Sequence, residues 1–99
     1  MKLLKEKAYD FLNQFIEKNL LSSSASVKEA LTKGELIDIS GKNFVLQCWE
    51  ESAGTDQVVC VELSRKKMLF LSEAYSLGVL FSDGVKRKLK QEELWDMGF

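Results

Sequence analysis

Apolar side chains recur at steps of three and four residues along the first twenty residues, which is the period of an α-helix. Charged and polar residues occupy most of the positions between them. The pattern predicts an amphipathic helix over residues 3–20 that buries one of its faces. The apolar positions of that face are Leu4, Ala8, Phe11, Leu12, Phe15 and Ile16.

A run of serines at residues 22–24 interrupts this pattern, and a second helical signal follows it. Ser26 and Glu29 have the spacing of a capping box, in which the hydroxyl accepts a backbone N–H and the carboxylate reaches back to another. Gly34 then stands where a helix would stop. The sequence therefore predicts a short second helix from Ser26 to Lys33.

After Gly34 the period of the apolar residues changes from about 3.6 to 2, which is typical of β-strands. Strands are predicted at residues 35–39, 43–51 and 57–64, with short polar segments between them. The chain contains no proline, so no strand is marked as an edge strand on that ground.

Asp83 and Gly84 stand between two apolar segments and predict a tight hairpin. Both central residues of such a turn need positive φ angles, which these two residue types accept. The preceding segment, residues 67–80, is ambiguous. It fits either a further strand or a short turn of helix around residues 73–77.

These elements predict one α+β domain spanning residues 1–99, a length typical of a single core. Two N-terminal helices would pack on a four- or five-stranded, mostly antiparallel sheet. The first helix is expected to cover one sheet face, because neither element can bury its apolar side alone. A short C-terminal helix is expected at residues 91–99, where Leu94 and either Trp95 or Met97 would fold back on the body.

Two cysteines, Cys48 and Cys60, lie on neighbouring predicted strands. A five-residue loop from Ser52 to Asp56 would place them directly opposite each other, with Cβ atoms about 5 Å apart. The prediction is two free thiols packed side by side. The same register assigns the core face to Val45, Gln47, Trp49, Val59, Val61 and Leu63, and the opposite face to Phe44, Leu46, Cys48, Val58 and Cys60.

Catalytic and metal-binding patterns are weak in this sequence. A structural zinc site needs about four ligands, and the chain has two cysteines and no histidine. A thiol nucleophile needs a base or a lowered pKa, whereas apolar burial raises the pKa. Glu50 and Glu51 are adjacent on a strand and point to opposite faces. We therefore expect neither an enzyme nor a cofactor nor a metal site.

The net charge and the hydropathy pattern indicate where in the cell the protein is located. The formal net charge is −1, and charged residues interrupt the apolar N-terminus, which argues against a secretory signal. No run approaches the roughly 20 apolar residues of a membrane span. A cytoplasmic protein that does not contact membranes is expected.

Basic residues concentrate in residues 65–90, with seven Lys or Arg against two acids. A stripe of these side chains would suit phosphate groups and indicates a nucleic-acid-associated module as an alternative function. Lysines that protect an edge strand are the competing explanation. The stripe would consist of Arg65, Lys66, Lys67, Lys86, Lys88 and Lys90.

Protein binding is the function that the sequence favours. In size and in its lack of catalytic chemistry, the chain is similar to bacterial toxin-immunity proteins, which act by occluding a partner. We expect Phe44 or Trp49 to serve as an apolar anchor, and acidic side chains to meet a partner such as a toxin with a basic surface. Those acids are Glu50, Glu51, Asp56 and Glu62. A homodimer formed through a sheet edge or an exposed apolar face is a further alternative.

Overall fold

The computed structural model describes residues 3–22, 27–68 and 71–99, and for residues 67–68 only the backbone. The chain begins with a helix and continues as a series of strands. In order, the elements are α1 (Leu4–Ile16), the π-helical turn η1 (Glu17–Leu21), α2 (Val27–Ala30), β1 (Thr32–Ile39), β2 (Lys42–Ala53), β3 (Asp56–Met68), β4 (Leu71–Ser82), β5 (Val85–Leu89) and α3 (Gln91–Asp96).

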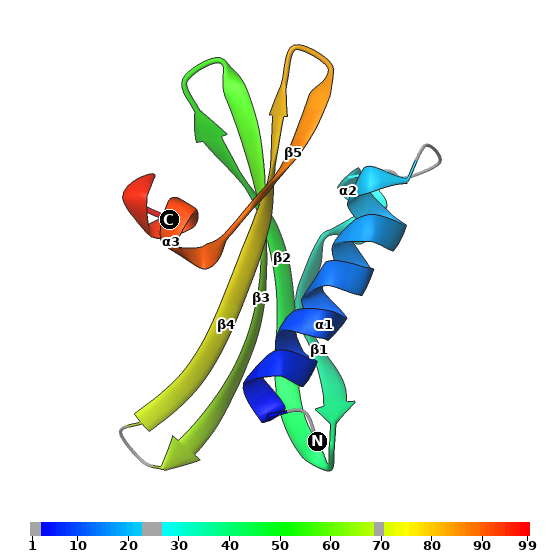
Figure 1. Cartoon of the computed structure of the whole chain (residues 1–99), viewed down its shortest axis with the longest axis vertical. Helices are drawn as coiled ribbons and strands as arrows, with labels where there is room; N and C mark the ends of the chain where they lie inside the picture. Colours follow the sequence, from blue (N-terminus) through cyan, green and yellow to red (C-terminus); the bar gives the residue numbers. More distant parts are fainter. Residues whose placement is uncertain (1–2, 23–26, 69–70) are drawn as a thin grey trace.

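The five strands form one antiparallel sheet in which each strand pairs with the next along the chain. Figure 1 shows the sheet strongly twisted, with α1 on one side and α3 on the other. The predicted α+β architecture with an antiparallel sheet is confirmed. The ambiguous segment belongs to the sheet, because β4 pairs with β3 from Leu71 to Phe81.

The helix predicted for residues 3–20 is confirmed as α1 and its continuation η1. Ala8, Leu12, Ile16 and Leu20 are completely or almost completely buried, so one stripe of the helix carries its packing. They contact the apolar side chains of one sheet face. That face contributes Phe44, Leu46, Cys48, Val59, Val61, Leu63 and Val79 to the core.

The prediction of two N-terminal helices, the second over residues 26–33, is wrong: α1 with η1 is the one N-terminal helix of the described residues. Within residues 27–33, helical structure is confined to the single turn of α2, and the chain enters β1 at Thr32. The expected cap residue Ser26 lies outside the described residues. Gly34, with a φ of 122°, does not stop a helix but sits at a bulge in β1, where the pairing shifts between Lys33 and Glu35.

The register predicted for β2 and β3 is wrong by one residue. The strands are joined by a two-residue turn in which Gly54 has a φ of 67°, and Ala53 pairs with Asp56. A tight turn of this kind needs a positive φ at its first central position, which glycine supplies. Cys48 therefore stands opposite Val61, and Cys60 stands opposite Trp49.

This shift changes which residues of β2 enter the core, because side chains alternate between the two faces of a strand. The assignment of Val59, Val61 and Leu63 to the core under α1 is confirmed. The assignment for β2 is reversed. Phe44, Leu46 and Cys48 enter that core, whereas Val45, Gln47 and Trp49 lie on the face that carries α3.

On the α3 face, one row of residues crosses four strands. Trp49 pairs with Cys60, Cys60 with Gly78, and Gly78 with Leu89. Gly78 has no side chain, and Leu94 of α3 occupies the space above it. A Cβ atom at position 78 would lie 2.8 Å from Leu94 Cδ2 and 3.1 Å from the backbone oxygen of Val59. Gly78 therefore sets how closely α3 approaches the sheet.

The C-terminal residues fold back over α3 through a Schellman motif. Phe99 N–H donates to Leu94 O at 2.9 Å, and Gly98 N–H donates to Trp95 O at 3.0 Å. Gly98 has a φ of 87°, as this motif requires. Phe99 and Leu94 join the same apolar cluster, so the motif places the last aromatic ring against the helix that it ends.

We predict that Gly78→Ala destabilises the protein by about 1 to 3 kcal/mol, because the added methyl group overpacks the contact with Leu94. Leu94→Ala alone should cost about 2 to 4 kcal/mol through the cavity it leaves. Urea denaturation of both single variants and the double variant measures these values. The loss in free energy of unfolding of the double variant should be about 1 kcal/mol smaller than the sum of the two single losses. Strict additivity would contradict the contact.

Candidate functional site

The residues proposed as a partner-binding surface lie on two different faces of the sheet. Phe44, expected as an apolar anchor, is completely buried beneath α1, so its ring cannot reach a partner, and this assignment is corrected. Glu50 lies on the same side of the sheet as Phe44 and accepts a hydrogen bond from the Gln57 side chain. Neither Phe44 nor Glu50 belongs to the surface around α3.

Trp49, Glu51, Asp56 and Glu62 share the α3 face. Trp49 is half-buried, and its indole N–H donates to Glu51 Oε1 at 3.1 Å. Residues 43–64 of the β2–β3 hairpin contain four acidic residues and neither lysine nor arginine, whereas the basic residues of the hairpin stand at its open end, at positions 42 and 65–67. The part of the hairpin nearer the turn therefore presents an acidic surface beside an aromatic ring.

The two tryptophans of the chain border one small hollow between the sheet and α3. Trp95 is 62% exposed and Met97 38%, whereas Leu94 is buried. The expectation that Trp95 or Met97 would pack on the body together with Leu94 is wrong for both. The hollow encloses about 70 Å³ and is lined by Trp49, Cys60, Glu62, Ser76, Leu94, Trp95 and Phe99.

Glu62 is the acidic side chain of this hollow. It pairs across the sheet with Gln47 and Ser76 and is half-buried. Burial raises the pKa of its carboxyl above the usual value. Among the described residues, no hydrogen bond or ion pair to this carboxylate is found. The hollow therefore holds a carboxylate that no cationic side chain of the described residues neutralises.

The cysteines do not form the expected pair. Cys48 belongs to the core under α1, and Cys60 belongs to the cluster under α3, so the two thiols point to opposite faces. Burial, together with the neighbouring Cys60 and Glu50, raises the pKa of Cys48 to about 12. Burial, together with Glu51 and Glu62, raises the pKa of Cys60 to about 11. Both thiols are free and are protonated at neutral pH.

Three of the six basic side chains expected to form a phosphate-binding stripe have partners within the protein. Arg65 donates to Glu73 at 2.7 Å and lies 5.6 Å from the centre of the Phe44 ring. Lys86 donates to the backbone oxygen of Leu20 at 2.8 Å. Lys88 contacts Glu17 at 3.0 Å and Asn13 at 3.2 Å. The lysines of β5 thus hold α1 and η1 against the sheet.

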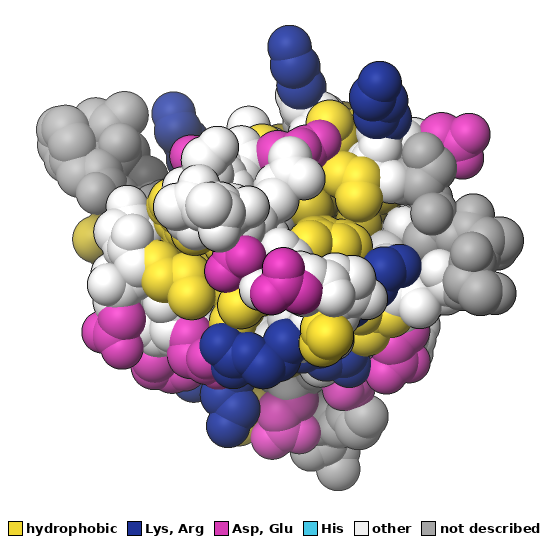
Figure 2. Space-filling model, turned by 90° about the horizontal axis from the view of Figure 1, so that it is seen from above, with side chains coloured by type: hydrophobic (Ala, Val, Ile, Leu, Met, Phe, Trp, Pro, Cys, Tyr) yellow, Lys and Arg dark blue, Asp and Glu magenta, His cyan; other side chains and the backbone are white. Residues whose placement is uncertain are grey.

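These basic groups are also far apart. Arg65 pairs with Glu73 and Lys86 with Phe81, which places them roughly 25 Å apart along β4. Lys66 lies on the α3 face, Lys90 follows the end of β5, and the side chain of Lys67 is outside the described residues. Figure 2 views the turn end of the hairpins, where basic, acidic and apolar side chains are mixed, whereas Arg65 and Lys66 lie near the opposite end of β3. The predicted continuous stripe is not formed.

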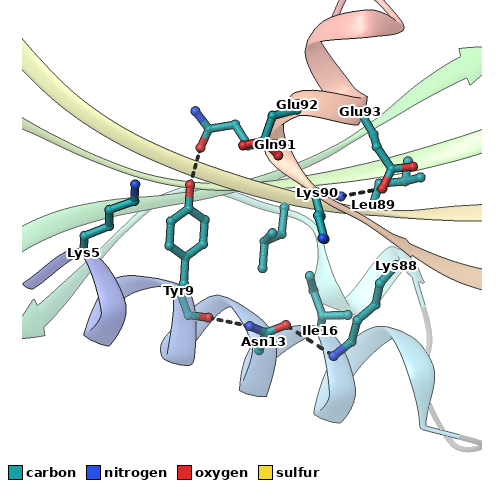
Figure 3. A pocket seen from close by; sticks show the side chains of 11 residues that line it. Lys5, Tyr9, Asn13, Ile16, Lys88, Leu89, Lys90, Gln91, Glu92 and Glu93 are labelled. Carbon is teal, nitrogen blue, oxygen red and sulfur yellow. Dashed lines mark hydrogen bonds between the residues drawn. The ribbon is translucent and has the colours of Figure 1, made fainter. Parts of the chain in front are cut away.

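A larger cleft of about 410 Å³ lies between α1 and the junction of β5 with α3 (Figure 3). Tyr9 O–H donates to Gln91 Oε1 at 2.7 Å, and the same oxygen accepts the Ser76 N–H at 3.0 Å. Burial and the charge of Glu92 raise the pKa of Tyr9, which keeps this donor protonated. These hydrogen bonds link α1, β4 and α3 across the cleft.

In the described ranges 3–22, 27–68 and 71–99, no three Cys, Asp or Glu side chains come together as a set of metal ligands. No helix in these ranges has the length and hydropathy to cross a bilayer. Comparisons with protein-family models, with curated proteins and with solved structures gave no match.

We predict that Glu62→Gln is more stable than the wild type at pH 7. Burial raises the folded-state pKa of Glu62 above its unfolded value, so the folded state binds this proton more tightly. Ionisation therefore opposes folding, and the penalty is present at pH values above the folded-state pKa and vanishes as the carboxyl is protonated. Urea denaturation at pH 7 and pH 4 measures the difference, which should shrink at pH 4.

Glu29→Gln removes one negative charge from an exposed position on α2 and is the matched control. If Glu62→Gln proved less stable than the wild type at pH 7, the carboxylate would have a favourable partner in the folded protein.

Proposed function

We propose that this protein binds a protein partner with a basic surface and acts by occluding it, as toxin-immunity proteins do. The supporting observation is that both tryptophans border one hollow, beside residues 43–64 of the β2–β3 hairpin, which include four acids and neither lysine nor arginine. We call this surface the tryptophan face. Its members are Trp49, Glu51, Glu62 and Trp95.

Trp95 is the feature of this face that most needs an explanation. An indole ring exposed to 62% on a six-residue helix leaves apolar area in water, although Leu94 and Phe99 already secure that helix to the sheet. Tryptophan is among the residues most enriched at the centres of protein interfaces. Its exposure in the free protein is therefore better explained by binding than by folding.

The acids indicate the charge of the partner. Glu51 and Glu62 lie beside the tryptophans, and Asp56 lies further along the same hairpin. Acidic side chains at the rim of an interface accelerate association with a basic partner and exclude acidic ones. The same charges disfavour nucleic acid at this face, because phosphates would be repelled.

Affinity capture with the full chain as bait, from a lysate of the source cells, tests the proposal. The captured protein must be identified, stoichiometric and basic at its contact surface. Trp95→Ala should weaken its binding by at least about 2 kcal/mol, roughly thirtyfold, because a central aromatic anchor is lost. The association rate of the purified pair should also fall as salt is raised from about 0.05 to 0.5 M.

Leu36→Ala is the matched control. Leu36 is 72% exposed on the same sheet face but lies on β1, away from α3. A partner that binds both variants equally would place the interface elsewhere, and the absence of any stoichiometric partner would remove the support for the proposal.

A further inference from the structure

We infer that the hollow between Trp49 and Trp95 receives an arginine side chain of the partner, with Glu62 as its counter-ion. This inference rests on the proposed function and specifies the group that the tryptophan face recognises. The hollow joins aromatic walls to a partly buried carboxylate, which is the combination that a guanidinium group fits.

The walls of the hollow come from three segments. Trp49 is supplied by β2, Trp95 by α3, and Phe99 by the Schellman motif that folds the chain end back. A guanidinium group stacks on the faces of such rings and sheds water more readily than an ammonium group does. The aromatic walls therefore favour arginine over lysine.

Glu62 supplies the charge of the hollow. Glu62 and Cys60 alternate with Val61 along β3 and so share one face, which brings the carboxylate next to the row that contains Trp49. A carboxylate held partly away from water, with no partner among the described side chains, is unfavourable until a cation reaches it. An arginine of the partner supplies that cation and two or more donors for charge-assisted hydrogen bonds.

The size of the hollow agrees with this occupant. About 70 Å³ is the liquid volume of roughly two water molecules, which suits a small planar group such as guanidinium and is too small for an aromatic side chain. A second copy of this chain is a weaker candidate, because its own tryptophan face would bring Glu51 and Glu62 against the same acids.

A titration of the ¹⁵N-labelled full chain with N-acetyl-arginine methylamide tests the inference. The indole N–H signals of Trp49 and Trp95, assigned with the two Trp→Phe variants, should shift and saturate with a dissociation constant on the order of 1 mM. The citrulline analogue, which is neutral and of the same shape, should shift neither signal. The lysine analogue should bind at least about threefold more weakly.

Glu62→Gln should weaken the arginine probe at least about fivefold, whereas Glu29→Gln should not change it. Equal shifts with the citrulline analogue, or binding that is unaffected by Glu62→Gln, would overturn the inference.

If the arginine probe does not bind while Trp95→Ala still abolishes partner capture, only the arginine contact is wrong. If the probe binds but no basic partner is captured, the hollow recognises guanidinium and the proposed function fails. Dimerisation in light scattering that Trp95→Ala abolishes would assign the face to a second copy instead.

Discussion

The contact of Leu94 with the bare backbone of Gly78 is the constraint on which the α3 side of the molecule depends. It lets a helix of only six residues lie close to the sheet, and the Schellman motif then adds Phe99 to the same cluster. With Leu94 turned inward, the next residue, Trp95, faces solvent. The burial of one side chain thus produces the exposure of its neighbour and creates the hollow that we propose as a binding site.

The sheet satisfies a second constraint, because apolar residues must be buried on both of its faces. α1 covers the core that contains Phe44 and Cys48, and α3 covers the cluster around Cys60. Lys86 and Lys88 stabilise the packing on the first of these faces, because they bind the end of α1 and η1. Basic residues that suggest a ligand in the sequence therefore stabilise the fold, and the acids of the other face remain available to a partner.

Local signals in the sequence were sufficient for α1, for the hairpin at Asp83 and Gly84 and for the terminal helix. They were not sufficient for the pairing of β2 with β3, because that pairing depends on whether the turn around Gly54 has two residues or five. That single difference decides whether Cys48 and Cys60 face each other. Trp49 and Glu62 could be chosen from their place on the acidic hairpin, whereas Trp95 could not, since its exposure follows from the tertiary contact of Leu94.

The tryptophan face depends on two features, the register of β2 with β3 and the contact of Leu94 with Gly78. Both are tested by nuclear Overhauser effects in the full chain labelled with ¹³C and ¹⁵N. We expect strong contacts between the Leu94 methyl protons and the Gly78 Hα protons, together with cross-strand contacts between Trp49 and Cys60. Contacts between the Cβ protons of Cys48 and Cys60, without any between Leu94 and Gly78, would contradict this expectation.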